Sequence, residues 1–257
     1  MKKRNIAVVT GASSGLGKEF VRQLHRYQTI EEIWCLARQP QKLQKVADEL
    51  GTKIRTFSVD LAVTEQIKEF QAKLSQENVS IKILVNSAGF AKFCSYDDLN
   101  LERSLNMIDV NIKGVVAMGL ICIPYMRKGS HIINIASLAS FQPLPYLNLY
   151  SATKAFVKNY SRALHVELKD RGIIVTAVCP GWIKTALYDR ANIGATKTIH
   201  RFTGMTTPDK VVRRALRDAA RARDLSVYGC TTKLCHTASK LLPHRVIMKL
   251  WLLYQGL

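Results

Sequence analysis

Apolar residues along the chain follow two alternating patterns, which predict strands and helices in turn. Short runs rich in β-branched residues, typical of strands, occur at Ile6–Val9, Ile33–Leu36, Ile54–Ser58, Ile81–Val85, His131–Ile135, Ile173–Val178 and Leu225–Tyr228. Stretches with apolar residues three and four positions apart predict helices, for example at Leu16–His25, Ile67–Leu74, Ala155–Leu168 and Asp209–Asp224. Strands that are apolar on both faces and alternate with helices indicate an α/β fold of the doubly wound Rossmann type, a parallel sheet of about seven strands with helices on both faces.

No linker or internal repeat divides the chain, so we expect a single domain. Residues 1–229 are predicted to bind the cofactor and carry the reaction, and residues 230–257 to form a basic, amphipathic tail. Beyond Gly229 the tail holds Lys233, Lys240, Arg245 and Lys249 but no acidic residue. This pattern is compatible with three roles: packing over a substrate pocket in the same domain, packing across a dimer interface, or peripheral contact with an anionic membrane.

The composition indicates a folded chain with a large positive charge. There are 38 Lys+Arg and 19 Asp+Glu, which give a formal charge of +19. A hydrophobic fraction of 47% with 22% charged residues supports a sizeable core and excludes a disordered chain. A charge surplus of this size favours an anionic partner such as nucleic acid, a membrane surface or a phosphorylated ligand.

The cysteines and the N-terminus bear on the compartment. None of the six cysteines forms a CxxC pair, and Cys230, Cys235 and His236 lack a second pair of ligands, so we predict no metal site. Free cysteines favour a reducing, cytoplasmic location. The apolar run Ile6–Val9 is too short for a signal peptide, and the uncharged run Gly114–Met126 is too short to span a bilayer. We therefore expect a cytoplasmic protein, with peripheral membrane contact as an option.

A glycine-rich loop follows the first predicted strand, where residues 10–17 are TGASSGLG. In such a loop Gly11 permits a tight turn, Gly15 lets the backbone approach a pyrophosphate, and Gly17 allows the helix to pack closely on the strand. The helix that begins here also directs free N–H groups towards the phosphates. An ordinary strand–helix turn is the alternative, but the position directly after the first strand favours a dinucleotide site.

The end of the second strand bears on the choice of cofactor. A NAD site places an acidic residue about 20 residues beyond the loop, where it binds the ribose hydroxyls. In this chain that position is Ala37, followed by Arg38. A guanidinium can pair with a 2′-phosphate and no carboxylate repels that phosphate, which favours NADP(H) over NAD(H). The alternative for Arg38 is a solvated loop arginine.

A candidate reaction site lies in a predicted helix after the fifth strand. Tyr150 and Lys154 are four residues apart and therefore share one helical face. A free phenol has a pKa near ~10, and a cation within ~4–6 Å lowers that pKa by about 1–3 pH units. The pair can then exchange a proton with a carbonyl/alcohol couple. Ser137, after the fifth strand, and Asn111, in an earlier helical region, complete the set.

Taken together, these motifs resemble the short-chain dehydrogenase/reductase family, in the branch with TGxxxGxG and YxxxK motifs, over nearly all of residues 5–228. The resemblance implies that Tyr150 is the catalytic acid/base and that Lys154 lowers its pKa and holds the nicotinamide ribose. It implies that Ser137 orients the substrate carbonyl and that Asn111 anchors a proton-relay water. The resemblance also implies a set of cofactor contacts: Gly11, Ser13, Ser14, Gly15, Leu16, Gly17, Asp60, Leu61, Asn86, Ala88, Gly89, Tyr150, Lys154, Pro180, Gly181, Ile183 and Thr185. Arg38 joins this set because it can pair with a 2′-phosphate. The family's NNAG motif reads Asn86-Ser87-Ala88-Gly89 here, so the contact of its second asparagine is absent.

The resemblance implies hydride transfer between NADP(H) and a carbonyl or secondary alcohol, in a homodimer or homotetramer. Two segments near the site are rich in apolar residues, a predicted lid with Leu187, Tyr188, Ile193, Ile199, Phe202 and Met205, and an approach with Phe141, Pro143, Leu144, Pro145, Tyr146 and Leu149. Core packing is one explanation, and the other is a pocket for a large apolar ketone. Within the family this favours a hydroxysteroid dehydrogenase acting on a steroid or bile acid, with a reductase of fatty or 3-oxoacyl-type ketones as the alternative.

The rival from another class is a non-catalytic NADP-binding regulator or a nucleic-acid binder, which the net charge favours. The complete set of Asn111, Ser137, Tyr150 and Lys154 argues for an enzyme instead. Aromatic residues interleaved with basic ones, which single-strand binders need, are not evident. No nucleic-acid partner is therefore expected.

Overall fold

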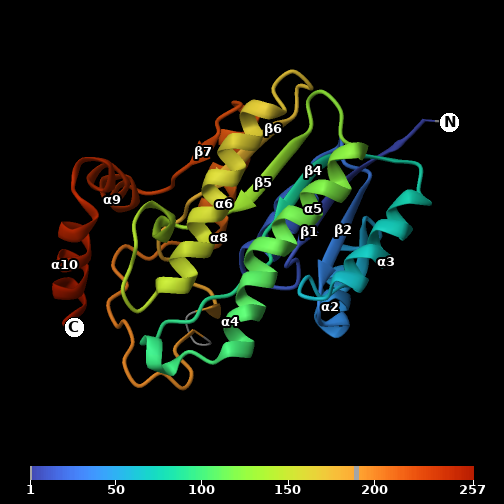
Figure 1. Cartoon of the computed structure of the whole chain (residues 1–257). Helices are drawn as coiled ribbons and strands as arrows, with labels where there is room; N and C mark the ends of the chain where they lie inside the picture. Colours follow the sequence, from blue (N-terminus) through green and yellow to red (C-terminus); the bar gives the residue numbers. More distant parts are fainter. Residues whose placement is uncertain (1, 188–190) are drawn as a thin grey trace.

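The computed structural model describes residues 2–187 and 191–257, and a parallel sheet forms its centre (Figure 1). The strands are β1 (Arg4–Thr10), β2 (Glu32–Ala37), β3 (Ile54–Ser58), β4 (Val79–Asn86), β5 (His131–Ile135), β6 (Ile174–Val178) and β7 (Leu225–Ser226). Their order is β3-β2-β1-β4-β5-β6-β7, and each neighbouring pair is parallel. The predicted doubly wound α/β fold is confirmed, and the direction of winding reverses between β1 and β4.

Helices cover both faces of the sheet (Figure 1). They are α1 (Gly15–Leu24), α2 (Pro40–Leu50), α3 (Thr64–Ser75), α4 (Leu101–Ile108), α5 (Gly114–Cys122), α6 (Asn148–Glu167), α8 (Pro208–Ala220), α9 (Cys230–Leu241) and α10 (His244–Gln255). One core joins α1, α2 and α8 to the sheet, and the other joins α3, α5 and the end of α6. Along β1, Ala7 and Val9 belong to the first core, and Ile6 and Val8 to the second. All four are fully buried, as two-sided coverage of a parallel strand requires.

The helix α4 continues into α5 through a π-helical turn at Asp109–Lys113. The resulting helical stretch, Leu101–Tyr125, is longer than the uncharged run in the sequence, and its length and composition would suffice to cross a membrane. Half of its most apolar window is buried inside the fold. Met118 and Cys122, for example, are fully buried in the second core, which is typical of a core helix.

Several predicted boundaries differ from the structure, most clearly at two helices. The helix predicted at Asp209–Asp224 ends at Ala220, because the Asp218 carbonyl accepts hydrogen bonds from the N–H groups of Arg221 and Arg223, both at 3.1 Å. The next residue after Arg221, Ala222, has a left-handed φ of 52°, which ends the helix. The helix predicted to begin at Ala155 begins at Asn148.

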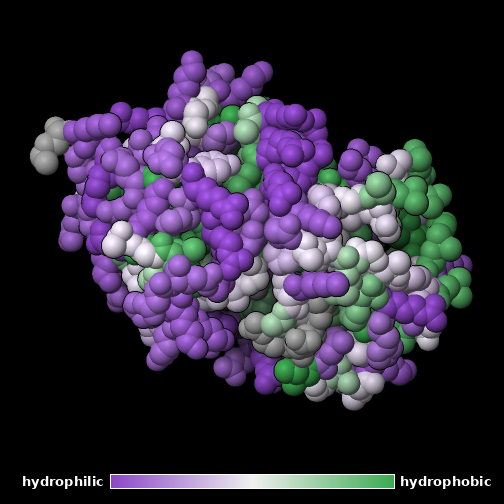
Figure 2. Space-filling view, turned by 180° about the vertical axis from the view of Figure 1, so that it is seen from behind, coloured by the Kyte–Doolittle hydropathy of each residue, from purple (hydrophilic) through white to green (hydrophobic). Residues whose placement is uncertain are grey.

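The tail helices α9 and α10 lie at one side of the molecule (Figure 1), where α9 contacts the 3₁₀ turn Leu138–Phe141. Seen from behind, the surface is largely hydrophilic except at the side where these two helices lie (Figure 2). The division of the chain at residue 229 stays a prediction.

Candidate active site

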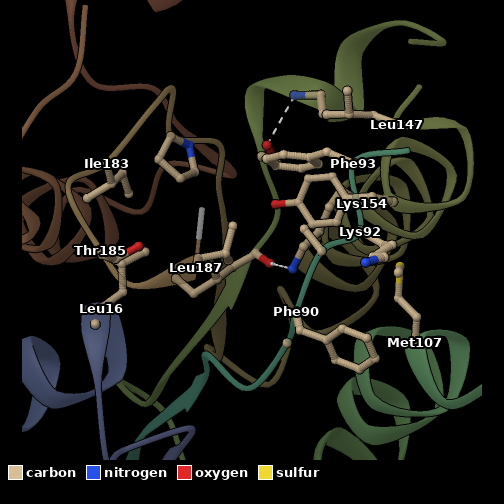
Figure 3. Close-up of a pocket in the computed structure, with 18 of the residues that line it drawn as sticks. Leu16, Phe90, Lys92, Phe93, Met107, Leu147, Lys154, Ile183, Thr185 and Leu187 are labelled. Carbon is tan, nitrogen blue, oxygen red and sulfur yellow. Dashed lines mark hydrogen bonds between the residues drawn. The ribbon is translucent and has the colours of Figure 1, made fainter. Parts of the chain in front are cut away.

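A cavity of about 1840 Å³ opens at the carboxyl ends of β1, β4, β5 and β6, where the winding reverses. Most of the predicted site residues line it: Gly11, Ser13, Ser14, Gly15, Leu16, Arg38, Asp60, Leu61, Ala88, Gly89, Ser137, Tyr150, Lys154, Pro180, Gly181, Ile183 and Thr185. Figure 3 shows Ile183 and Thr185 on one side of this space and Phe93 and Lys154 on the other. The fold thus brings together side chains from segments far apart in the sequence. Gly17, Asn86 and Asn111 do not line the cavity.

The glycine loop closes tightly against its neighbours. Gly11 has a φ of 65°, and a Cβ there would lie 2.8 Å from the backbone nitrogen of Ala88. A Cβ on Gly17 would lie 2.2 Å from the carbonyl oxygen of Gly11, so Gly17 serves the packing of α1 on the loop. No side chain caps the first turn of α1, and Ser14 and Gly15 line the cavity. The N–H groups of that turn are therefore suited to an anion.

Thr10 is a site residue that the sequence did not single out. Its Oγ1 accepts hydrogen bonds from the backbone N–H groups of Ser87 and Ala88, both at 3.1 Å. The hydroxyl is buried at the end of β1 and joins that strand to the loop after β4. Position at a strand end, directly before the glycine loop, was the signal that could have found it.

Asn86, a predicted cofactor contact, lies beneath the cavity instead. It is 2% exposed, and its Nδ2 donates to Oδ1 of Asn134 at 2.9 Å. Asn134 in turn donates to the hydroxyl of Ser161 on α6, also at 2.9 Å. The side chain therefore links β4 to β5 and, through Asn134, to α6, and its role as a cofactor contact stays a prediction.

Asn111 lies in the π-helical turn, fully buried. Its Oδ1 accepts from the Phe90 N–H at 3.1 Å, and its Nδ2 donates to the Phe90 carbonyl at 3.0 Å and to Thr153 Oγ1 at 3.1 Å. Both amide hydrogens are therefore used, and the side chain fixes the loop after β4 against α6. A π-helical turn disrupts the regular ladder of backbone hydrogen bonds and is frequent at functional sites.

Lys154 is the most electrostatically perturbed group in the cavity wall. It is 5% exposed, and its Nζ donates to the Ile135 carbonyl at 2.8 Å. The same Nζ lies 5.8 Å from the centre of the Tyr150 ring. Burial lowers the pKa of Lys154 from 10.5 to about 8. The ammonium is therefore still mostly protonated at neutral pH, and its charge lies next to the phenol.

Ser137 lies at the end of β5 and begins the 3₁₀ turn Leu138–Phe141. Its Oγ accepts a hydrogen bond from the Ala139 N–H at 3.2 Å, which leaves the hydroxyl hydrogen to donate into the cavity that it lines. The adjoining Leu138 N–H donates to the Pro180 carbonyl at 2.8 Å. The turn thus holds Ser137 and the segment after β6 in one rigid unit.

The end of the cavity next to β2, where the sequence predicts the adenosine half of the cofactor, is basic; we call it the adenine end. Arg38 and Lys42 both line it. One Arg38 nitrogen lies 4.0 Å from the Asp60 carboxylate, and the guanidinium stays largely exposed. Asp60 is itself held by the N–H of Ala62, which donates to its Oδ1 at 2.9 Å. Arg38 can therefore turn towards a bound phosphate at little cost.

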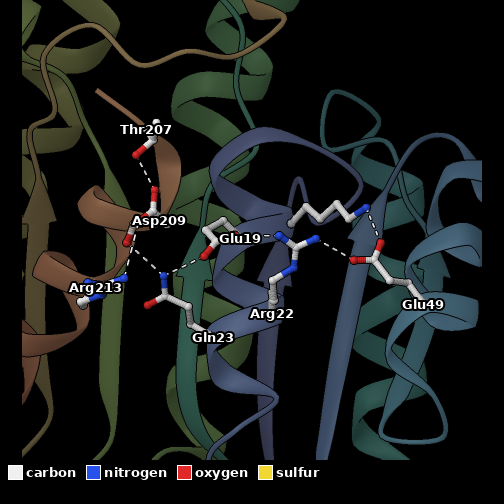
Figure 4. A network of polar contacts seen from close by, with 8 residues as sticks. Glu19, Arg22, Gln23, Glu49, Thr207, Asp209 and Arg213 are labelled. Carbon is white, nitrogen blue, oxygen red and sulfur yellow. Dashed lines mark hydrogen bonds and ion pairs between the residues drawn. The ribbon is translucent and has the colours of Figure 1, made fainter. Parts of the chain in front are cut away.

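A polar network lies at this end (Figure 4), and its members Lys18, Glu19 and Arg22 line the cavity. Arg22 pairs with Glu49 at 2.6 Å and with Glu19 at 3.4 Å, and Lys18 pairs with Glu49 at 2.6 Å. The hydrogen bonds from Lys18 and Arg22 lower the pKa of Glu49. The network joins α1 to α2, and Gln23 extends it by donating to the carbonyl of Asp209 on α8 at 3.0 Å.

Aromatic side chains form the wall at the opposite end of the cavity, where the sequence predicts the substrate; we call it the substrate end. Phe93 contacts Tyr150 and Trp182 edge to face, with ring centres 6.1 Å and 6.2 Å apart, and Trp182 contacts Phe202 at 4.9 Å. Of the apolar residues predicted to line a pocket, Leu144, Leu187 and Ile193 do line the cavity, and Tyr188 lies outside the described residues. The others do not line it: Phe141, Pro143, Pro145, Tyr146, Leu149, Ile199, Phe202 and Met205. Phe141 instead turns away and stacks on His236 at 4.1 Å.

The tail packs against this end of the cavity, and its role stays a prediction. Trp251 lines the cavity and donates from Nε1 to the Pro145 carbonyl at 3.0 Å. Gln255 is buried and holds the lid backbone: its Oε1 accepts from the N–H groups of His200 and Arg201, both at 3.0 Å. Its Nε2 returns a hydrogen bond to the Arg201 carbonyl at 3.1 Å.

Comparison with known proteins agrees with this geometry. A family model described as short chain dehydrogenase matches residues 5–195. An uncharacterized oxidoreductase of Staphylococcus epidermidis is 35% identical over 199 residues, which are 77% of this chain and 86% of the relative.

Two further relatives carry more specific names. A very-long-chain 3-oxoacyl-CoA reductase of Anas platyrhynchos is 35% identical over 191 residues, which are 70% of this chain and 60% of the relative. Among solved structures, a serine dehydrogenase complexed with NADP+ is 29% identical, with a TM-score of 0.73, covering 87% of this chain and 94% of that one.

Proposed function

Because the chain belongs to the short-chain dehydrogenase/reductase family, we propose that it transfers hydride between NADP(H) and a carbonyl or secondary alcohol of a large apolar substrate. One observation carries this proposal. Ser137, Tyr150 and Lys154 share the wall of one cavity whose far end is aromatic. A proton donor, a hydrogen-bond donor and an apolar pocket are what reduction of a bulky ketone requires.

The cavity fits a phosphorylated dinucleotide. The uncapped first turn of α1 suits a pyrophosphate, and the tight approach at Gly11 and Gly17 leaves no room for a side chain in the loop. Arg38 and Lys42 suit a 2′-phosphate, since both line the adenine end and Arg38 replaces the acidic residue of a NAD site. The relative whose structure holds NADP+ supports the same preference.

When bound, the nicotinamide supplies or accepts the hydride. Tyr150 then donates its phenolic proton to the carbonyl oxygen in reduction and takes a proton from the alcohol in oxidation. Ser137 donates its hydroxyl hydrogen to the same oxygen and orients it. Lys154, charged below pH about 8, stabilises the negative charge that develops on the Tyr150 oxygen. Asn111 acts through the Phe90 backbone and Thr153, by holding the loop after β4 in place.

The substrate class follows from the walls of the cavity. Flat aromatic faces at Phe93, Trp182 and Trp251 suit a fused ring system, which supports a hydroxysteroid, either a steroid or a bile acid. The second candidate is a long-chain 3-oxoacyl ketone, which the avian relative's name supports. Both are large apolar ketones, and they differ in shape and in the acyl carrier.

The test measures consumption of NADPH and of NADH with three sets of ketones: steroid, bile-acid and 3-oxoacyl thioester. We expect turnover with NADPH and at least one bulky ketone. Tyr150→Phe should lower kcat at least a hundredfold and keep NADPH affinity nearly unchanged, because the phenol acts only in proton transfer. Tyr160→Phe, on the same helix but outside the cavity, is the matched control and should keep normal turnover. Absence of ketone-dependent turnover, together with salt-sensitive DNA affinity, would favour the rival regulator or nucleic-acid binder.

The proposed assembly is a cytoplasmic homodimer or homotetramer. Large apolar side chains are exposed on two neighbouring helices, Leu120 on α5 and Phe156 and Val166 on α6. A helix face of this kind is suited to pairing with a second copy.

A further inference from the structure

The outer face of α10 carries an apolar stripe. Val246, Leu250 and Leu253 follow one another at steps of four and three residues, and each is exposed. Leu257 follows the left-handed Gly256 that ends the helix and is exposed too. Leu253 is 73% exposed, which is high for a leucine in a helix that packs against the body of the protein. The side of the molecule where α9 and α10 lie is also the more hydrophobic part of the face in Figure 2. Apolar residues at this spacing form a continuous face, and a continuous exposed face indicates an interaction surface.

The neighbouring helix α9 extends the same surface. Leu234 and Leu241 are seven residues apart, so they lie on one side of α9, and they are 71% and 76% exposed. The connection between the helices adds Leu242, which is also exposed. We call these seven residues the tail face: Leu234, Leu241, Leu242, Val246, Leu250, Leu253 and Leu257.

Cations border the tail face and acidic residues are absent from the tail. Lys233 and Lys240 lie on α9, Arg245 and Lys249 on α10, and all four are exposed. Residues 230–257 contain no Asp or Glu. Long basic side chains beside an apolar stripe can extend to phosphate groups while the stripe enters the acyl region.

A bilayer suits this surface better than a second copy of the chain. In a symmetric dimer the same patch meets itself, so the four cations of one tail would face those of the other with no acidic residue between them. An anionic lipid surface has the opposite charge and an apolar interior. Charge complementarity therefore favours an anionic bilayer over a second copy of the chain as the partner of the tail face.

We propose that the tail face binds the surface of an anionic lipid bilayer. The inner side of the same helix lines the substrate cavity through Ile247 and Trp251, and Leu242 and Leu250 belong to both surfaces. Binding would place the mouth of the cavity at the lipid surface, where an apolar ketone partitions from water. This second consequence depends on the proposed function, whereas the binding itself does not.

The test is flotation of the full-length protein with two kinds of vesicles, one of phosphatidylcholine alone and one of equal parts phosphatidylcholine and phosphatidylglycerol. We expect binding to the second kind at low salt and weaker binding at high salt. Leu241→Gln/Leu253→Gln should lower the partition coefficient about tenfold or more. Lys240→Gln/Lys249→Gln should lower it about fivefold for each cation removed.

Leu101→Gln/Leu105→Gln provides the matched control. These two leucines are also exposed, on α4, and Leu101 is 75% exposed. The control should bind vesicles as the unmodified protein does. The proposal is overturned if the unmodified protein binds neither vesicle at low salt, or if the control loses binding equally. It is also overturned if Leu241→Gln/Leu253→Gln dissociates an oligomer in sedimentation and leaves vesicle binding unchanged.

Vesicle binding and ketone reduction are measured separately, so the two proposals fail independently. Binding without ketone turnover leaves the tail face assigned and removes the proposed function. When both hold, the KM for a ketone carried in anionic vesicles should rise in Leu241→Gln/Leu253→Gln, and the KM for a water-soluble ketone should stay the same.

Discussion

Replacing Lys154 with methionine is expected to stabilise the folded protein at neutral pH while removing its activity. The ammonium is buried against the Ile135 carbonyl, and within the described part of the chain it forms no ion pair with a carboxylate. Burial of a charge without a counter-ion destabilises the fold. Methionine has a similar length, carries no charge and adapts its shape to the space.

The magnitude follows from the pKa of Lys154. A fall from 10.5 to about 8 corresponds to about 3 kcal/mol, at about 1.4 kcal/mol for each tenfold change in proton affinity. The unfolded chain binds more protons between these two values, so stability rises with pH in that window. The cost is complete below pH about 8 and disappears above the unfolded pKa. Loss of the hydrogen bond to Ile135 costs about 1 kcal/mol, which leaves a net gain of about 2 kcal/mol at pH 7.

The assay is urea unfolding and thermal unfolding of the cofactor-free protein and of Lys154→Met at pH 7 and above pH 10. The variant should be more stable at pH 7, with a Tm about 5 °C higher, and slightly less stable at the high pH. Its kcat/KM should fall by a factor of about 10² to 10⁴, because the charge beside Tyr150 is gone.

Lys158→Met is the matched control. Lys158 lies one turn further along α6 and also donates to a backbone carbonyl, that of Ser140 at 2.8 Å, but it is only half-buried. The control should change stability less and keep turnover. The reasoning is refuted if Lys154→Met is no more stable than the unmodified protein at pH 7, or if the difference between them does not change with pH.

Three further changes test other parts of the structure. Arg38→Asp should lower kcat/KM with NADPH at least tenfold and raise the NADH/NADPH ratio, because a carboxylate repels the 2′-phosphate; steady-state kinetics with both cofactors measures this. Gly17→Ala should destabilise the fold by about 3 kcal/mol or more, since the new Cβ would lie 2.2 Å from the Gly11 oxygen, and thermal unfolding will report it. Asp218→Asn should lower stability by about 3 kcal/mol in urea unfolding, because this fully buried carboxylate pairs with Arg214 at 2.6 Å and accepts from Ser226 at 2.8 Å.

The sheet could be predicted because its signal is local. Strands covered on both sides must be apolar at every position, and Ile6 to Val9 meet that condition within four residues. The reaction pair was also local, since Tyr150 and Lys154 are one turn apart in the same helix. Lengths were harder: β7 ends at Ser226, two residues before the prediction, and α8 ends where the Asp218 carbonyl takes two later N–H groups.

The roles of the asparagines could not be predicted in the same way, because their partners are distant in the sequence. Asn86 donates to Asn134 and Asn111 to Thr153, contacts that span 48 and 42 residues. A sequence motif indicates that an amide side chain is required at the positions of Asn86 and Asn111. Only the folded arrangement shows whether the amide faces a ligand or joins two elements of the core.

The lining of the substrate end was predicted least well, for a related reason. Apolar residues between Ser137 and Tyr150 can either line the cavity or pack in the core. The spacing of apolar residues along the sequence does not distinguish these two positions. Leu144 faces the cavity, whereas Phe141 stacks on His236 of the tail. The tail itself supplies Ile247 and Trp251, roughly a hundred residues beyond the reacting groups.

The two ends of the cavity are therefore held by different parts of the chain, the sheet at one end and the tail at the other. The reacting end lies on the sheet: Thr10 at the end of β1 binds the loop after β4, Ser137 binds the turn after β5, and Lys154 donates to the last residue of β5. The substrate end is held by the tail, and of the described residues of α10 Gln255 alone is fully buried. Elements with few buried contacts open at lower free energy than core strands. Under the proposed function, we therefore expect changes in the tail to alter which ketone enters, and how it arrives, without moving Ser137, Tyr150 or Lys154.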